Sequence, residues 1–517
     1  MRPNKTFDAS FRSRARTHPC PQGKLFVSPR PLGLMDSTRL RFYHGTVYYT
    51  PFWKKRKKIF LTLRFLLVRR EKLWYNLPQA VKNRLPTSGR LRILRRKRWF
   101  RLDNAGKLYP AVSTSRWSSA FRVSAELTEP IDPARLQKAA DLVLARFPSL
   151  KVRMRAGFFW YYLEEIKEPL TVRPDAGHPC MPFRFKQDHG YLLRVFYFGN
   201  RISAEFFHSL TDGSGGMAFI KTLTVEYLRL GGKKVEFDNG ALPLRESPRP
   251  EETQDAFLHM PLPKVRASRK EGKAYHFPAT PEIPHTLHII AASIPCEPLR
   301  QRAKALNASV TEYLVGAMLW VAYQDQDKRR TRKKLPLRVS VPVNMRAFYP
   351  VPTMRNFSTF VNPGIDPRLG EYTFEEIVGL VRAYMRYAVH PKLLSAVIAT
   401  NVADEKNIVV RLIPRVIKNL VISGIFRQAG DKLVTSTLSN LGKTAIPTGA
   451  EKLIRRFEFQ LGSPSAPLCN CAAVTTGDEM RLIFSSNIRE TTLPRELLRF
   501  LVEQGITATV ESNWEDD

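Results

Sequence analysis

Cysteine is scarce in this sequence, with only 5 among 517 residues. An odd, sparse set argues against a disulfide framework and favours a reducing compartment, so we expect a cytoplasmic protein. One residue separates Cys469 from Cys471 and no second pair exists, which does not match the spacing of common metal sites. His178 and Cys180 form no better set. We therefore predict no metal site and buried cysteines at Cys180, Cys469 and Cys471; the other two cysteines are Cys20 and Cys296.

Long apolar runs are also lacking. A transmembrane helix needs ~20 consecutive apolar residues, and no segment approaches that length. The longest candidate near the N-terminus, Ile59 to Val68, contains Arg64 and is not followed by a clear small-residue cleavage site. We predict neither a membrane span nor a signal peptide.

Acidic residues are rare at one end of the chain. Residues 1–107 hold 28 Lys and Arg against 4 Asp and Glu, which is +24 of the total net charge of +37. Residues 1–98 thus form a basic N-terminal extension, disordered or partly helical, with clusters such as Lys54 to Lys58 and Arg95 to Arg98. Three interpretations remain open: a solvated tail that the folded protein does not need, a contact with an anionic membrane surface or acidic carrier protein, or a contact with nucleic acid.

From about Trp99 the chain has the alternating helix and strand patterns of a packed α/β protein. We predict a first lobe over residues 99–238, a proline-rich linker over 239–284 and a second lobe over 285–517. The main predicted elements of the first lobe are strands Phe121–Leu127, Phe158–Leu163, Tyr191–Phe198 and Arg201–Phe207 and helices 132–147 and 217–230. Those of the second are strands 285–294, 337–343, 357–361, 433–438, 469–475 and 480–486 and helices 297–306, 312–324, 372–389 and 494–504.

The segment His208 to Gly213, with the sequence His-Ser-Leu-Thr-Asp-Gly, follows the second strand of a predicted hairpin. A histidine at a strand end can take a proton from a hydroxyl or amine, because its pKa lies near working pH. Gly213 lets the backbone turn where a side chain would clash. Gly215 and Gly216 open the next helix, whose free N–H groups suit an anion or a carbonyl oxygen. The alternative is a buried histidine before an ordinary Asp-Gly turn.

Several segments in order resemble the HxxxDG acyltransferase superfamily, which includes chloramphenicol acetyltransferase, condensation domains and alcohol acyltransferases. His208 to Gly213 matches HxxxDG itself, and together the matching segments cover about residues 99–510. The others are Ala145 to Leu150 (ARFPSL), Ser309 to Thr311, Pro342 to Arg346 (PVNMR), Asn356 to Asn362 (NFSTFVN) and Thr437 to Gly442 (TLSNLG).

The resemblance implies an α/β fold with two similar chloramphenicol-acetyltransferase-like lobes, each a mixed sheet flanked by helices, around a central tunnel. It also implies an acyltransferase, with an acyl-CoA or acyl-carrier thioester as co-substrate, an alcohol or amine acceptor and no permanently bound cofactor. Phe207 precedes His208 where condensation domains usually show a second histidine, and no DFGWG element is present. Both departures favour the alcohol-acetyltransferase-like branch, and a length sufficient for both lobes favours a monomer.

In this interpretation His208 is the general base of a direct transfer without an acyl-enzyme. Asp212 is structural, with Arg346 as its partner; the alternative for Arg346 is a surface arginine. Gly213 gives clearance to the thioester arm, and Gly215 and Gly216 contact substrate. Asn440 either holds the substrate or caps a turn. Two alternative functions remain: a carrier-protein-dependent transferase or condensation enzyme for a lipid or peptide product, and a non-catalytic nucleic-acid- or membrane-binding protein on the same fold.

Overall fold

The computed structural model describes residues 98–513, apart from residues 115–116, 176, 266, 268–270 and 331–332. The chain divides into two units at Ile93 and Leu94, close to the predicted end of the basic extension. The predictions made for that extension, including its basic clusters and its partners, lie outside the described residues. All that follows concerns the second unit.

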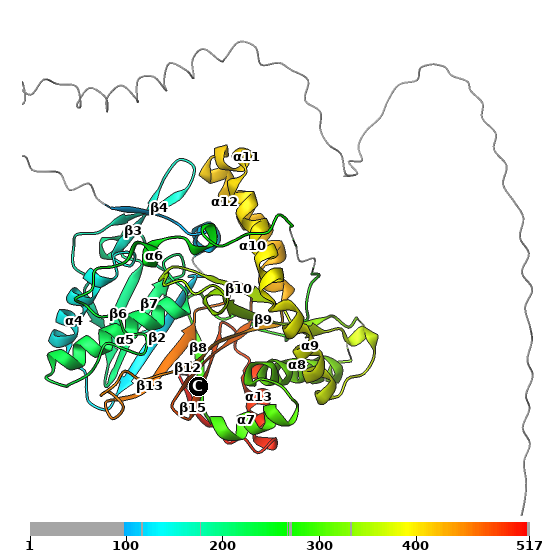
Figure 1. Ribbon diagram of the computed structural model, residues 1–517. Coiled ribbons are helices and arrows are strands. Elements are labelled where there is room, and N and C mark those ends of the chain that lie inside the picture. Colours follow the sequence, from blue (N-terminus) through cyan, green and yellow to red (C-terminus); the bar gives the residue numbers. More distant parts are fainter. Residues whose placement is uncertain are drawn as a thin grey trace, which may run out of the picture. The chain divides into compact units, whose positions relative to one another are not determined.

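The first lobe is built on a five-stranded sheet with the order β13-β2-β7-β6-β5 (Figure 1). The predicted hairpin is confirmed, since β6 and β7 pair antiparallel and Gly199 takes the positive φ of a tight turn. A small separate sheet has the order β1-β4-β3. The strands are β1 (Trp99–Arg101), β2 (Ala120–Leu127), β3 (Val152–Ala156), β4 (Tyr161–Glu165), β5 (Val172–Pro174), β6 (Leu193–Phe198), β7 (Arg201–Phe207) and β13 (Ile454–Leu461).

Two helices of this lobe, α4 (Pro133–Arg146) and α5 (Gly213–Leu230), pack against each other, and α5 packs on β2 and β7. Each begins at an aspartate whose side chain accepts backbone N–H groups, Asp132 for α4 and Asp212 for α5. Such caps satisfy donors that a helix start leaves without partners. Leu142 of α4 lies on the outer face of the helix, since its side chain is 44% exposed.

The second lobe is built on an eight-stranded mixed sheet with the order β10-β9-β12-β14-β15-β8-β16, and β11 pairs with β9. Figure 1 shows its helices α7, α8, α9 and α13 gathered together, with the buried helix α8 in contact with the other three. The strands are β8 (His288–Pro295), β9 (Leu337–Asn344), β10 (Ser358–Val361), β11 (Gly364–Ile365), β12 (Ser436–Thr444), β14 (Cys469–Thr476), β15 (Glu479–Ser486) and β16 (Thr509–Ser512); the helices are α7 (Cys296–Ala305), α8 (Val310–Lys328), α9 (Phe374–Ala388) and α13 (Thr492–Glu503).

The lobes are not separated at the predicted boundary. Strand β13 comes from the C-terminal part of the chain, yet it pairs antiparallel with β2 in the sheet of the first lobe. This strand was not predicted from the sequence, although its buried Phe457 and Phe459 alternate with charged residues as in a strand with one buried face. The predicted linker also packs closely, since its Phe257 and Phe277 are buried in the core of the second lobe. A short helix, α6 (Pro250–Thr253), lies within it.

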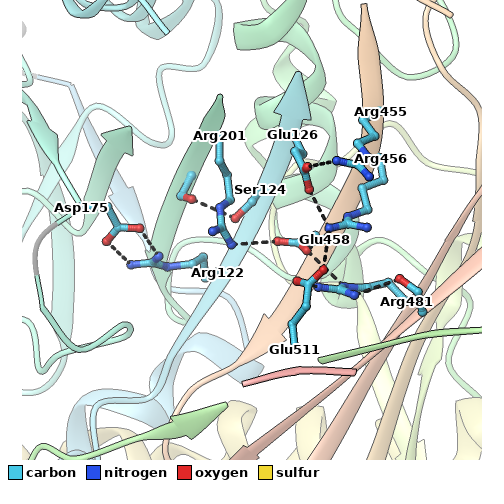
Figure 2. A network of polar contacts seen from close by, with 12 residues as sticks. Arg122, Ser124, Glu126, Asp175, Arg201, Arg455, Arg456, Glu458, Arg481 and Glu511 are labelled. Atoms are coloured by element: carbon cyan, nitrogen blue, oxygen red, sulfur yellow. Dashed lines mark hydrogen bonds and ion pairs between the residues drawn. The ribbon is translucent and has the colours of Figure 1, made fainter. Parts of the chain in front are cut away.

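Those charged residues of β13 belong to an ion-pair network between the two sheets (Figure 2). Glu458 pairs with Arg481 of β15 at 3.2 Å, and Arg456 pairs with Glu126 of β2 at 2.8 Å. Arg481 also pairs with Glu511 of β16. Because each buried charge has a partner of opposite sign, the network joins the strands without leaving an uncompensated charge.

Three helices between α9 and β12 were not predicted: α10 (Pro391–Lys406), α11 (Ile408–Leu412) and α12 (Arg415–Ala429). Figure 1 shows these yellow helices reaching from α9 toward the tip of the β3–β4 hairpin. Two predicted strand boundaries also shift. Residues Phe158 to Trp160 form a bend before β4, and Ser439 to Gly442 lie inside β12 rather than after it.

No single helix in the described ranges is long and apolar enough to cross a membrane. The bent pair α7 and α8 passes the same test of length and composition when taken together. Most side chains of α8 are buried in the core of the second lobe.

Candidate active site

A cavity of about 610 Å³ lies between the two lobes, and His208 is part of its wall. From the first lobe, the end of β7 and the start of α5 contribute His208 and Ser214. From the second lobe, β9 and β12 contribute Pro342 and Asn440. The motif histidine therefore lies where both lobes can contact a bound molecule, as a cleft site requires.

The imidazole ring of His208 is fixed on several sides. Its ring stacks on Tyr109 of the short helix α3 (Tyr109–Val112), with 4.4 Å between centroids and an angle of 11° between planes. Phe121 packs against it in an edge-on arrangement, with 5.1 Å between the ring centroids. Nδ1 lies 3.1 Å from Oδ1 of Asn356, a residue of the second lobe. Stacking and hydrogen bonding together hold the ring in one orientation.

The neighbours of Asn356 determine which ring nitrogen carries the proton. Its Nδ2 donates to the Asp103 carboxylate at 3.2 and 3.3 Å and to the backbone oxygen of His208 at 2.9 Å. Since all three acceptors lack hydrogens, the amide nitrogen must face them and Oδ1 must face His208. Nδ1 of the neutral imidazole is therefore the donor, and Nε2 keeps its lone pair.

Asp103 is held in turn by Arg355 at 3.1 Å, and both side chains are almost fully buried, at 0% and 1% exposure. The backbone N–H of Gly106 also donates to this carboxylate, at 2.6 Å. Arg355, Asp103, Asn356 and His208 thus form one chain of polar contacts that begins in the core and ends at the cavity. Such a chain fixes the orientation of the His208 ring.

Burial lowers the pKa of His208 below the usual 6.5. Its own backbone carbonyl, Asp212, Asn356 and Asp103 act in the opposite direction. Desolvation dominates because it disfavours the charged imidazolium. The ring is consequently neutral near neutral pH, which is the form that accepts a proton.

The structure brings Asp212 and Arg346 together, as expected, at 2.8 Å. The same carboxylate accepts the N–H groups of Gly215 at 3.1 Å and Phe357 at 2.8 Å. Arg346 also donates to the backbone oxygens of Thr353 and Arg355, so the alternative of a free surface arginine is wrong. These contacts connect the turn after His208 to the second lobe.

The three glycines of the motif region serve packing. A Cβ on Gly213 would lie 2.7 Å from Leu441 Cδ2, so its close neighbour is β12, although Gly213 does line the cavity. A Cβ on Gly215 would lie 2.1 Å from Thr211 Oγ1, and one on Gly216 would lie 2.9 Å from Phe121. Gly215 and Gly216 are buried against the protein and do not line the cavity, so this geometry gives no support to their predicted contact with substrate.

Asn440 lines the cavity, but both ends of its amide are engaged within the protein. Nδ2 donates to Thr311 Oγ1 at 3.0 Å, and Oδ1 accepts the N–H of Gly442 at 2.8 Å. The register of β12 against β14 shifts just after Asn440, and Gly442 has a positive φ. Asn440 therefore braces an irregular strand, which supports the turn-cap interpretation over substrate holding.

Sequence reasoning did not single out Tyr109, Asp103 or Arg355, and it used Asn356 only as part of a matching segment. Asn356 lies 148 positions from His208, and no periodic pattern connects the two. The available signal was the polar pair Arg355-Asn356 just before a strand, since buried polar residues near an active site often orient it.

The described residues contain no group of three or more His, Cys, Asp or Glu side chains that could hold a metal ion. Cys469 and Cys471 are buried in β14, and Cys180 and Cys296 are buried as well. Burial raises the pKa of the Cys469 thiol to about 12, so this group is not a reactive thiolate.

No protein-family model matches the sequence, and no curated protein does so. Solved structures do match in fold. TRI101 of F. graminearum, complexed with coenzyme A and T-2 mycotoxin, is 12% identical with a TM-score of 0.53, over 80% of this chain and 99% of that one. The trichothecene 15-O-acetyltransferase TRI3 of Fusarium sporotrichioides is 10% identical with a TM-score of 0.54, over 79% and 94%. The first condensation domain of the CDA synthetase is 16% identical with a TM-score of 0.51, over 79% and 96%.

These likenesses confirm the predicted fold class. The chain has the two-lobed α/β fold that acetyltransferases and condensation domains share, with mixed sheets flanked by helices. At such low identity, substrate and activity do not follow from the fold.

Proposed function

We propose that the protein is an acyltransferase that moves an acyl group from a CoA thioester to an alcohol, with His208 as general base. The observation that carries the proposal is the orientation of Asn356, which leaves Nε2 of a neutral, cavity-wall imidazole as proton acceptor. The fold adds support, since acetyltransferases and condensation domains share it.

In the proposed reaction, Nε2 of His208 takes the proton of the acceptor hydroxyl while the oxygen attacks the thioester carbonyl. The carbon–sulfur bond then breaks, and the imidazolium returns the proton to the departing thiolate. The products are an ester and a free thiol. Neither a nucleophilic side chain nor an acyl-enzyme enters this sequence, and a base of this kind contributes about 10²–10⁴-fold to the rate.

The lining of the cavity favours an acceptor with apolar surface and few hydroxyls. Aromatic rings of Tyr109, Trp117, Phe257 and Phe459 form part of the wall, beside the hydroxyls and amides of both lobes. Rings give contact area, while a small number of polar groups fixes orientation. An amine acceptor would use the same base in the same way.

The test is release of free thiol by the full chain across a panel of acyl-CoA donors and apolar alcohols. Turnover that depends on acceptor, and that His208→Ala abolishes while His178→Ala preserves it, supports the proposal. His178 is exposed and outside the cavity, which makes it a matched control. Acceptor-dependent turnover that His208→Ala leaves intact would contradict it.

A carrier-protein donor is the second candidate, because condensation domains share the fold. The same acyl group presented on CoA and on an acidic carrier protein separates the two donors. Faster transfer from the CoA thioester at equal concentration supports the first proposal, whereas transfer from the carrier alone supports the second.

A further inference from the structure

Helices α11 and α12 expose apolar side chains and turn polar ones inward, the reverse of a usual surface helix. Leu420 of α12 is 67% exposed and Ile408 of α11 is 71% exposed. The exposed positions recur at the spacing of one helix face. We call this surface the apolar patch, formed by Ile408, Val409, Leu412, Val416, Ile417, Leu420, Val421 and Ile425.

The inner face of α12 is held by polar contacts, so the exposed face is a fixed feature of the fold. Lys418 is buried, its Nζ donates to the backbone oxygen of Phe159 at 3.2 Å, and it lies 3.7 Å from the ring centre of Trp160. Asn419 donates to the hydroxyl of Tyr161 at 3.0 Å, and Ser423 donates to the backbone oxygen of Ala111 at 2.5 Å. Rotating the helix to bury its apolar face would break all of these bonds.

The tip of the β3–β4 hairpin extends the apolar patch. Phe158 is 73% exposed, and its backbone oxygen accepts the N–H of Arg415 at the start of α12. Arg415 also donates to the backbone oxygen of Gly157 at 3.1 Å. Hairpin tip and helices therefore lie side by side, as Figure 1 shows.

The charged residues within α11 and α12 are all basic, although Asp404 and Glu405 precede α11 and Asp431 follows α12; Arg415 and Lys418 are turned inward. Between Asn407 and Gly430 the sequence has four basic residues and no acidic one. Arg411 is exposed beside Leu412, and Lys406 is exposed just before α11. Apolar helix faces flanked by arginine and lysine suit the surface of an anionic bilayer, where acyl chains meet the apolar side chains and phosphates meet the cations.

We propose that the apolar patch and the tip of the β3–β4 hairpin dock on an anionic phospholipid bilayer, with α11 and α12 lying in its surface. The docked face adjoins the cavity. Phe426 of α12 stacks on Trp117 of the cavity wall at 4.8 Å, and α12 packs on α3, which carries Tyr109. A bound bilayer would be separated from His208 by α12 and by α3, whose Tyr109 stacks on the histidine ring.

The first test is sedimentation of the full chain with vesicles of phosphatidylcholine containing 30% phosphatidylserine. The double variant Leu420→Glu with Ile425→Glu places two charges in the centre of the apolar patch. We expect its vesicle affinity to fall at least about tenfold. The matched control is Leu369→Glu with Tyr387→Glu, which alters two other exposed side chains and should bind as the wild type does.

The second test separates the apolar patch from the basic N-terminal extension, which could also bind anionic vesicles. An environment-sensitive dye is attached at Val421→Cys, in a chain whose Cys20 is replaced by serine; the four other cysteines are buried. Vesicles should shift the dye emission to the blue, and Leu420→Glu with Ile425→Glu should abolish the shift. The same dye at Leu369→Cys should not respond.

Three results would overturn the proposal. The double variant could bind vesicles as tightly as the wild type, or the dye at position 421 could remain in water when vesicles are bound. The chain could also self-associate through the apolar patch, with size rising with concentration and no vesicle binding, which would make a second copy its occupant.

Discussion

Two arginine–aspartate pairs connect the second lobe to the first beside His208, and they differ in what they orient. Arg346–Asp212 lies at 2.8 Å and holds the turn that follows the histidine. Arg355–Asp103 lies at 3.1 Å, is more deeply buried, and acts on the histidine ring through Asn356. The first aspartate belongs to the recognisable motif and the second to none. The motif therefore contains the residue that holds the turn after His208, while the residues that orient the ring, Asp103 and Asn356, lie outside it.

The largest effect on activity is expected at His208, which both pairs help to position. His208→Ala should lower acceptor-dependent thiol release by about 10²–10⁴-fold, because it removes the general base. The melting temperature should fall by less than in Asp103→Ala, since His208 is partly exposed whereas Asp103 is fully buried. Thiol release and thermal unfolding of the same preparation measure both. Full retention of activity would contradict the proposal that His208 is the general base and that the two pairs position it.

Asp103→Ala should be the most destabilising change. It leaves the guanidinium of Arg355 buried without its carboxylate, and breaking a buried pair in this way costs about 3–5 kcal/mol. Denaturant unfolding measures the free energy, and Asp327→Ala, at an exposed pair with Lys334, is the control. A loss no greater than the control's would show that Asp103 is not the structural anchor described.

Asp212→Asn tests the other pair, Arg346–Asp212, and should lower stability and activity together. The substitution removes a charge-assisted bond to Arg346 and disturbs the N–H groups of Gly215 and Phe357, at an expected cost of about 1–3 kcal/mol. Turnover should fall with stability, because the turn positions His208. An unchanged melting temperature would mean that Asp212 is not structural.

Asn356→Ala should lower both rate and stability, because its buried amide also donates to Asp103 and to the backbone oxygen of His208. Removing a hydrogen bond to a group that becomes charged costs about 1.5–3 kcal/mol, or about 10- to 100-fold in kcat/KM. Since Asn356 raises the pKa of His208, its loss should also move the acid limb of the pH profile to lower pH. A slower enzyme with an unmoved limb would assign Asn356 a purely structural role.

The smallest expected effect is the pH dependence of the wild type. Burial lowers the pKa of His208, so kcat/KM should rise through a midpoint below 6.5 and then level off. The free energy of unfolding should also rise with pH over this range. Below pH 6.5 the unfolded chain binds a proton more readily than the folded protein, so stability decreases as pH falls toward the lower pKa of the folded state. His208→Gln should remove this part of the dependence. A midpoint above 6.5 would contradict the burial argument.

Local patterns predicted most of the helices and strands, because helix caps and hairpin turns are determined by residues adjacent in the sequence. Asp132 before Pro133 and the Gly199-Asn200 turn are examples. Strand β13 and helices α10 to α12 escaped because their environment is set by distant parts of the chain. Charged residues of β13 are paired with charges on β2 and β15. Helix α12 exposes an apolar face, whereas helical periodicity alone predicts that such a face is buried.

The site divides in the same way. His208, Asp212 and Arg346 were expected, because a motif and a matching segment carry them. Asp103, Tyr109 and Asn356 were not, because their positions follow from how the lobes close around the ring. Gly215 and Gly216 were assigned to substrate since a glycine-rich helix start suits anions, but close packing of α5 on the sheet accounts for them.

The ring nitrogen of His208 that carries the proton can be identified without substrate, and it decides whether Nε2 can accept a proton. Nitrogen NMR of the full chain labelled in histidine, with the signal assigned by its loss in His208→Gln, distinguishes a protonated from an unprotonated ring nitrogen. We predict a neutral ring at pH 7, with the proton on Nδ1 and an unprotonated Nε2. A proton on Nε2, or a charged ring at pH 7, would contradict this prediction.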